Sequence, residues 1–255
     1  MTSSLTSYID VAQIVLYAFW IFFFGLIYWL RMEDRREGYP LESDNPRFVG
    51  STKQMLIPSP KTFIHPNGHT TQAPDFKRDA RPINAERSAN AKGAALRPTG
   101  NPMLGNVGPA SYAQREDEPE LTRNGEDCIV PMRVATPYSV SAGPDPRGWD
   151  VVATDGKVAG TVKDIWVDRA DALVRYLEVE LAGAATGTRL LPITMLRLRR
   201  GPKMVEVKSV RAEHFADVPV LKSPDRVTLL EEDMIQAFYA GGRLYAEPKR
   251  LGPVL

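Results

Sequence analysis

The sequence is poor in side chains that bind transition metals or form cross-links. Cys128 is its only cysteine, so an internal disulfide and a thiolate cage around a metal ion are excluded. Only three histidines occur, and the Pro-Asn-Gly sequence between His65 and His69 indicates a turn rather than one face of a helix. Zinc needs further ligands, and no suitable set accompanies this pair. We therefore expect no metal site and an unreactive thiol at Cys128.

The sequence also lacks an excess of either charge. Its 32 Lys and Arg residues against 31 Asp and Glu give a formal net charge of +1, and the basic residues are scattered. A basic patch, the usual mark of nucleic-acid binding, is therefore missing. A Gly-rich phosphate loop, a nucleophile elbow and a metal motif are missing too. We expect neither a nucleic-acid partner nor an enzyme.

One long apolar stretch, VAQIVLYAFWIFFFGLIYWL, occupies residues 11–30 without a charge. About twenty helical residues span about 30 Å, the thickness of the hydrocarbon core of a bilayer. Twelve of these residues are Val, Ile, Leu or Phe, which together favour insertion by about 4 to 6 kcal/mol. The sequence predicts a single transmembrane helix over residues 11–36, in a lipid bilayer.

The flanks of this stretch predict its orientation. Residues 1–10 contain no Lys or Arg, whereas Arg31, Arg35 and Arg36 follow the span closely. Because positive charge stays in the cytoplasm, we expect residues 1–10 to be periplasmic and the bulk of the chain cytoplasmic. A cleaved signal peptide would need a basic start and a small-residue cleavage site, and the stretch has neither.

Residues 37–140 are rich in Pro, Gly and Asn, with few apolar runs. Composition alone is typical of a flexible tether. However, the aromatic side chains of Phe48, Phe63, Phe76 and Tyr112 lie among the prolines. We interpret this region as an extended segment ordered by the surface of a partner, with a flexible tether as the alternative.

Residues 141–255 have the pattern of a small domain of short strands. Asp155-Gly156 is a tight-turn signal, and residues 173–181, LVRYLEVEL, alternate between apolar and acidic side chains. In residues 158–168 we expect Val158, Val162, Ile165 and Val167 to point inward, with a bulge at Gly160. Several strands at this spacing predict a small antiparallel barrel or sandwich.

A helix is predicted over residues 229–240 near the C-terminus. Thr228 and Glu231 form a capping box, S/T-x-x-E, with Thr228 as the N-cap. Apolar residues follow at helical spacing, and Gly241 is expected to end the helix.

Nine short strings occur along the sequence beside the apolar stretch. They are REGYPLE (36–42), PKTFI (60–64), VGPASY (107–112), VSAG (140–143), DIWVD (164–168), LEVEL (177–181), RLLP (189–192), VTLLEED (227–233) and YAGG (239–242). Each string is weak alone, but their order and spacing together are specific and cover nearly the whole chain. In this order the strings resemble the H subunit of the purple-bacterial photosynthetic reaction centre.

The resemblance implies one transmembrane helix, an extended surface segment and a cytoplasmic barrel of the PRC type. It implies a chain without pigment of its own, located in the bacterial inner, intracytoplasmic photosynthetic membrane. The implied partners are the L and M subunits, which hold bacteriochlorophyll, bacteriopheophytin, quinones and iron, and a light-harvesting antenna ring. The implied role is to cap L and M, to stabilise the complex and to support proton delivery to the secondary quinone in light-driven electron transport.

The resemblance also implies residues for that proton pathway. Acidic positions of the family match Asp168 and Asp171, and a family arginine that can keep such a carboxylate charged matches Arg175. Asp171 replaces a glutamate and reaches one methylene less far. Two family histidines at the site where protons enter match Asn124 and Glu126, so the proton entry point differs here, and Glu126 and Asp127 are the candidates to substitute. The alternative for Asp168 and Asp171 is an ordinary solvated carboxylate at the end of a strand.

Two functions of different class follow. The first is the accessory subunit of a light-driven electron-transfer complex described above. The second is a membrane-tethered PRC-barrel adaptor that has no role in quinone chemistry. The proline-rich segment with its aromatic residues favours the first, because a tether does not need it.

Overall fold

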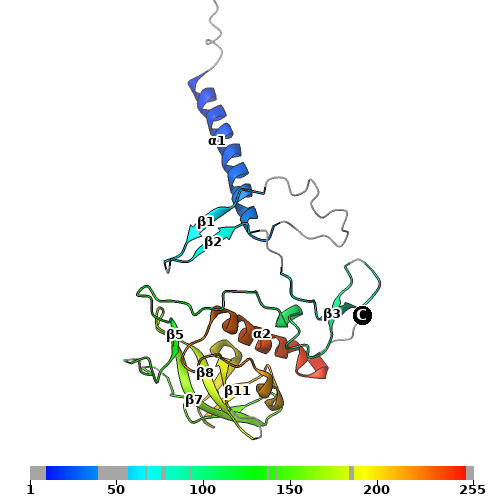
Figure 1. Cartoon of the computed structure of the whole chain (residues 1–255), viewed down its shortest axis with the longest axis vertical. Helices are drawn as coiled ribbons and strands as arrows, with labels where there is room; N and C mark the ends of the chain where they lie inside the picture. The colour runs from blue at the N-terminus through cyan, green and yellow to red at the C-terminus, as the bar shows by residue number, and fades with distance from the viewer. Residues whose placement is uncertain are drawn as a thin grey trace, which may run out of the picture. The chain divides into compact units, whose positions relative to one another are not determined.

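A computed structural model describes residues 10–39, 57–66, 68–75, 79–91, 93–136, 138–141, 143–183 and 187–250. The chain divides into two compact units, Met1–Asp79 and Ala80–Leu255, which are described separately. Figure 1 labels their main helices and strands.

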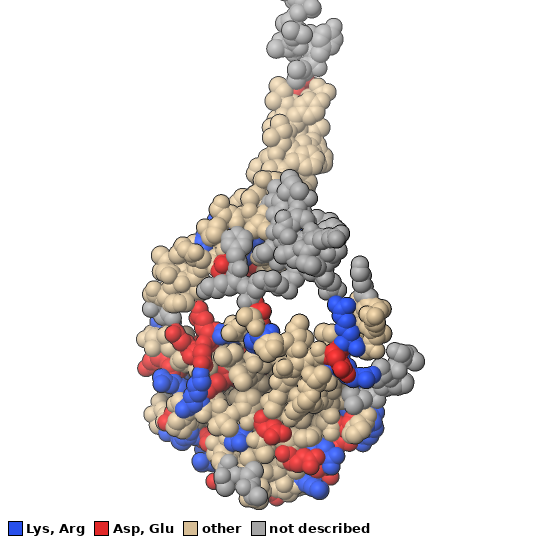
Figure 2. Space-filling model, turned by 45° about the vertical axis from the view of Figure 1, so that its right-hand side comes forward, with Lys and Arg blue, Asp and Glu red and all other residues tan. Residues whose placement is uncertain are grey.

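The first unit contains the predicted membrane span. Helix α1 runs over Val11–Glu33 and continues into the short 3₁₀ helix η2, Asp34–Arg36. Together they form one helix of 26 residues that is long and apolar enough to cross a membrane. None of the residues of α1 is buried within the chain, and Figure 2 shows the upper part of the helix without Lys, Arg, Asp or Glu side chains. The helix predicted over residues 11–36 is confirmed, and its length and composition suit a membrane span.

A β-hairpin is bound to the C-terminal end of this helix by hydrogen bonds and an ion pair. It consists of β1, Lys61–Ile64, and β2, Thr70–Ala73. The guanidinium group of Arg36 donates to the carbonyl oxygens of Ser59, at 2.8 Å, and Ala73, at 3.0 Å. Glu33 binds both Arg36 and Lys61 at 2.8 Å. The hairpin therefore begins where the apolar part of the helix ends.

The second unit is built on a seven-stranded sheet with the order β10-β11-β6-β7-β8-β9, in which β5 also pairs with β7. Its strands are β5 (Ile129–Pro131), β6 (Asp150–Val152), β7 (Val158–Asp168), β8 (Leu173–Leu181), β9 (Thr188–Pro192), β10 (Leu196–Arg199) and β11 (Met204–Val207). All neighbours are antiparallel except β11 and β6. The remaining elements are β3 (Ala85–Arg87), β4 (Leu96–Pro98), η5 (Gly108–Ala110), η6 (Ile193–Met195), η7 (Ala212–Asp217), α2 (Leu229–Tyr245) and η8 (Pro248–Arg250).

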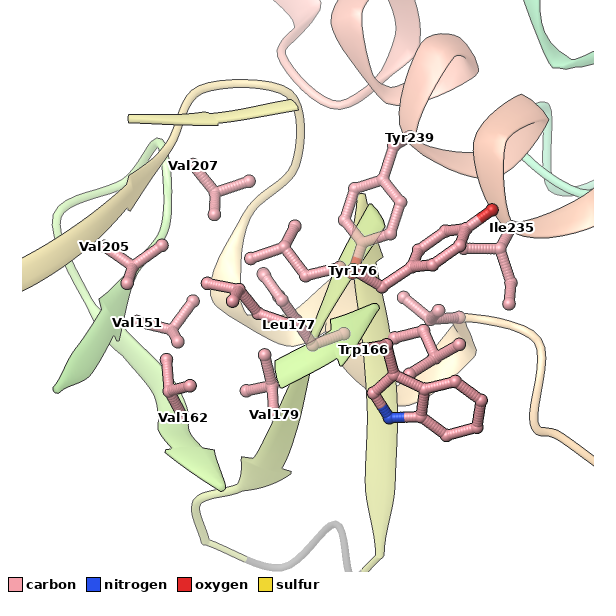
Figure 3. Close-up of a cluster of buried hydrophobic side chains, with 14 of the residues drawn as sticks. Val151, Val162, Trp166, Tyr176, Leu177, Val179, Val205, Val207, Ile235 and Tyr239 are labelled. Atoms are coloured by element: carbon pink, nitrogen blue, oxygen red, sulfur yellow. The ribbon is translucent and has the colours of Figure 1, made fainter. Parts of the chain in front are cut away.

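The core lies between the curled sheet and α2 (Figure 3). Val151, Val179, Val205 and Val207 from three parts of the sheet are fully buried, and Tyr239 of α2 reaches the same cluster. Burying such side chains stabilises the unit by about 1.5–3 kcal/mol each. The sheet and α2 thus share one hydrophobic core.

In the long hairpin β7–β8, two of the residues named in the sequence interpretation are placed differently from the prediction. Val158 was expected to point inward, but it is 48% exposed at the start of β7. Glu178 was expected on a polar face, but it is 4% exposed. Its carboxylate can be buried because Arg133 Nη1, at 2.5 Å, and Trp166 Nε1, at 3.1 Å, bind it.

The bulge expected at Gly160 lies next to it. Val151 and Val152 of β6 pair with Gly160 and Val158, so the register shifts by one residue there. A Cβ on Gly160 would lie 2.1 Å from the carbonyl oxygen of Glu180. Gly160 is therefore required by the close approach of β8.

Helix α2 begins as predicted, but it ends later. Thr228 Oγ1 accepts from the amide of Glu231 at 3.2 Å, and Glu231 Oε2 accepts from the amide of Thr228 at 2.9 Å, which is the capping box. The expected end at residue 240 is wrong, because the helix passes through Gly241 and Gly242 to Tyr245.

The two glycines serve packing rather than termination. A Cβ at Gly241 would lie 2.7 Å from Ala110 Cβ, and one at Gly242 would lie 2.4 Å from Val210 Cγ1. The helix ends instead where Arg250 Nη1 donates to the carbonyl oxygen of Gly242 at 3.1 Å. A cation at this position also suits the negative end of the helix dipole.

Candidate functional site

The turn between β7 and β8 carries two of the predicted acidic residues. Asp168 is the last residue of β7 and pairs with Leu173, the first of β8. Its Oδ1 accepts from the amides of Ala170, at 2.9 Å, and Asp171, at 3.2 Å. An aspartate that binds the amides two and three residues later stabilises a turn locally. The structure therefore places Asp168 beneath the turn and Asp171 on it.

Asp168 is a buried carboxylate that is held in its charged form. The residue is 2% exposed, and Arg175 Nε lies 3.1 Å from its Oδ2. Burial raises the pKa of Asp168, but the hydrogen bonds from Cys128 and the turn amides, together with the charge of Arg175, outweigh burial and lower that pKa below its usual value. Asp168 therefore acts as a fixed negative charge.

Cys128 supplies one of these donors. Its Sγ lies 3.1 Å from Asp168 Oδ1, and the residue, which directly precedes β5, is 3% exposed. Burial and the hydrogen bond to Asp168 raise the pKa of the thiol to about 11. Because the thiolate is the reactive form, Cys128 remains a protonated donor at neutral pH.

Asp171 and Glu126 are the solvent-facing acids of the predicted set. Asp171 is exposed, and its carboxylate makes no hydrogen bond or ion pair with the residues that the structure describes. The side chain of Glu126 is 62% exposed and lies 3.2 Å from Arg169 Nη1. Arg169 also donates to the carbonyl oxygen of Asp127. Arg169, which was not predicted, thus connects Glu126 to the turn.

A pocket of about 210 Å³ lies beside this turn. Its polar lining consists of Arg115, Glu120, Arg175, Tyr176, Thr194, Glu232 and Gln236. Arg175 belongs both to the pocket and to the ion pair with Asp168. The pocket is therefore continuous with the predicted site.

Glu232 is the titratable group of this pocket that the sequence interpretation missed. It is 8% exposed, and its Oε2 accepts from the hydroxyl of Tyr176 at 2.7 Å. Burial, together with the charge of Glu120, raises the pKa of Glu232 above its usual value, although the Tyr176 hydrogen bond and the charges of Arg175 and Arg115 lower it. Burial also raises the pKa of Tyr176, which stays a neutral donor.

The sequence contained a signal for Glu232. Counting along α2, residue 232 lies three before Ile235 and seven before Tyr239, both of which are fully buried. Residues at this spacing share one face of a helix. A glutamate on the apolar face of an amphipathic helix needs a partner, and Tyr176 is that partner.

In the part of the chain that the structure describes, no group of three or more His, Cys, Asp and Glu side chains is arranged to hold a metal ion. His65 and His69 lie at the turn of the β1–β2 hairpin, where the amide of His65 donates to the carbonyl oxygen of His69 at 2.8 Å. The turn predicted for this sequence is present.

Comparison with protein families accounts for both units. A model described as photosynthetic reaction centre, H-chain N-terminal region, matches residues 3–134, just over half of the chain. The chain belongs to this family. A model of the PRC-barrel domain matches residues 139–214, which contain β6 to β11. The H chain is therefore a membrane-bound subunit of a photosynthetic reaction centre, and its fold is the predicted one.

Membership of this family indicates the complex to which the chain belongs. The reaction-centre H chain is a structural subunit associated with the L and M subunits, and the cofactors of the complex are carried by other subunits. No cofactor-binding site is found among the described residues.

Proposed function

We propose that this H chain covers the cytoplasmic face of the L and M subunits, stabilises the complex and supports proton delivery to the secondary quinone. A doubly reduced quinone must take up two protons in a site shielded from water. Protons reach such a site through titratable groups and water molecules. The observation that carries the proposal is the buried, ionised Asp168 next to the exposed Asp171 on one turn.

The two acids have different tasks in this proposal. Asp168 does not exchange protons at neutral pH, since its surroundings keep it charged. Its fixed charge attracts protons towards the turn, as a fixed charge does in a region of low dielectric constant. Asp171 is exposed and takes protons from solvent, with Glu126 and Arg169 at the outer edge of the site.

The orientation of the chain is part of the same proposal. The basic residues Arg31, Arg35 and Arg36 at the C-terminal end of α1 favour a cytoplasmic second unit and a periplasmic N-terminus. The exposed aromatic side chains of α1, such as Trp20 and Phe24, face lipid, neighbouring helices or the antenna ring of the photosynthetic membrane.

The Asp171→Asn variant tests the proposal in the assembled complex. We expect the proton-coupled transfer of the second electron to the quinone to slow by about tenfold, equivalent to about 1.4 kcal/mol of barrier, when it is followed by flash spectroscopy. Asp171→Glu should retain the rate, because it keeps the carboxylate. Glu180→Gln is the matched control, since Glu180 is also exposed but lies at the other end of β8. Unchanged kinetics of Asp171→Asn at every pH would contradict the proposal.

A further inference from the structure

The pocket beside Asp168 is formed by three separate parts of the second unit. Tyr176 comes from β8, Glu232 and Gln236 come from the first half of α2, and Arg115 and Glu120 come from the segment before β5. At about 210 Å³, it has room for several water molecules, each of which occupies about 30 Å³ in the liquid. Its lining is rich in hydrogen-bonding groups, which suits water.

A chain of hydrogen bonds ends at Glu232 inside this pocket. Gln236 Nε2 donates to the hydroxyl of Tyr176 at 3.3 Å, and that hydroxyl donates to Glu232 Oε2 at 2.7 Å. Glu232 Oε1 has no hydrogen-bond donor among the described residues. The carboxyl group is therefore held by one oxygen, and the other oxygen is available to pocket water.

The neighbouring Glu231 is buried to a similar extent but is bonded differently. Its Oε1 accepts from the amide of Lys222 at 2.8 Å, and its Oε2 accepts from the amide of Thr228 at 2.9 Å. Both oxygens of Glu231 are thus used by the backbone around the start of α2. The carboxylate of Glu231 is therefore structural, whereas that of Glu232 faces the pocket.

The cations near Glu232 are paired with other acids. Arg175 forms its ion pair with Asp168 at 3.1 Å, and Arg115 lies 3.7 Å from Asp233. No ion pair joins Glu232 to a described Lys, Arg or His side chain. A buried carboxylate without its own cation favours the neutral form, which agrees with the raised pKa of Glu232.

We propose that the pocket is a proton-exchange site in which Glu232 binds one proton and Tyr176 positions its carboxyl group. On uptake, hydronium in the pocket gives its proton to the carboxylate and becomes water. On release, the carboxyl group returns the proton to water, and no electron is transferred. That this proton continues towards the secondary quinone rests on the function proposed above.

Glu232→Gln tests the site in the assembled complex by infrared difference spectroscopy in H₂O and D₂O. We expect the loss of one protonated carboxyl band from the pH titration and a smaller light-induced proton uptake. Glu180→Gln is the control, because Glu180 is exposed and does not line this pocket, and it should keep the band. A full set of carboxyl bands in Glu232→Gln would overturn the proposal.

Tyr176→Phe provides a second test that leaves Glu232 in place. Because the Tyr176 hydrogen bond lowers the pKa of Glu232, its removal should move the titration of the carboxyl band to higher pH. No shift would overturn the positioning role. If Glu232→Gln loses the band while proton uptake is unchanged, the connection to the quinone is wrong although the site exists. Asp171→Asn decides the proposed function independently.

Discussion

At the scale of single residues, Asp168 keeps its charge at 2% exposure because four donors surround it. A carboxylate that is hydrogen-bonded in this way contributes to stability only when it is ionised. Hydrogen bonds to charged groups contribute about 1.5–3 kcal/mol each. The turn between β7 and β8 should therefore depend on this charge.

Asp168→Asn should lower the free energy of unfolding at pH 7 by about 2 kcal/mol. Since the folded-state pKa of Asp168 is lowered, its stabilisation is present above the unfolded value of about 3.9 and is lost as the pH falls below that value. The difference between variant and wild type should accordingly shrink in acid. Denaturant unfolding of the full chain in detergent between pH 2 and pH 7 measures it. A difference that is independent of pH would contradict the role of the charge.

The partners of two buried glutamates could not be predicted from the sequence, because they are distant in the chain. The alternation of β8 correctly predicts that Leu177 and Val179 are buried. It wrongly predicts that Glu178 is exposed. Its burial depends on Arg133, which is 45 residues distant in the chain. Burial of Glu232 likewise depends on Tyr176, 56 residues away. Local patterns contain no information on such distant partners.

At the scale of elements, the last turns of α2 pack closely against Ala110 and Val210 through Gly241 and Gly242. Gly242→Ala should destabilise the second unit by about 1–3 kcal/mol, because the new Cβ meets Val210 Cγ1 at 2.4 Å. The better helix propensity of alanine, about 1 kcal/mol, offsets only part of this. Gly201→Ala is the control, since nothing lies within 4 Å of its Cβ position. Thermal or denaturant unfolding compares the two, and a stabilised Gly242→Ala variant would show that the packing relaxes.

The membrane helix supports a second prediction at this scale. Deletion of residues 1–30 removes about 4 kcal/mol or more of insertion free energy, which corresponds to about a thousandfold in partitioning. We expect the shortened chain to be recovered mainly outside the membrane and to associate poorly with L and M, as measured by co-purification. A deletion of residues 1–9 keeps α1 and serves as the control. Normal assembly without α1 would contradict its role as the anchor.

Elements with a strong local pattern were predicted well. The span of α1, the Asp155-Gly156 turn and the capping box of α2 each depend on a few neighbouring residues. By contrast, β5 has only three residues and ends in Pro131. Its strand conformation follows from pairing with β7, so the extended interpretation of residues 37–140 did not anticipate it.

At the scale of the whole molecule, the two functional predictions concern one unit. Asp168, Arg175 and Glu232 all belong to Ala80–Leu255. The family comparison places the chain in the reaction centre, whereas the roles of these residues depend on contacts that the sequence did not reveal. The fold class was therefore predictable from pattern and resemblance, and the pocket required the structure.

The parallel pairing of β6 with β11 also sets an order of events during synthesis. Met204 pairs with Asp150, so the sheet cannot be completed before residues more than fifty positions further along the chain have been made. About 170 residues separate the end of α1 at Glu33 from the end of β11 at Val207, which takes roughly 10 to 35 s of translation. The anchor thus leaves the ribosome long before the sheet can close, so we expect the second unit to fold on a chain whose membrane helix is already complete.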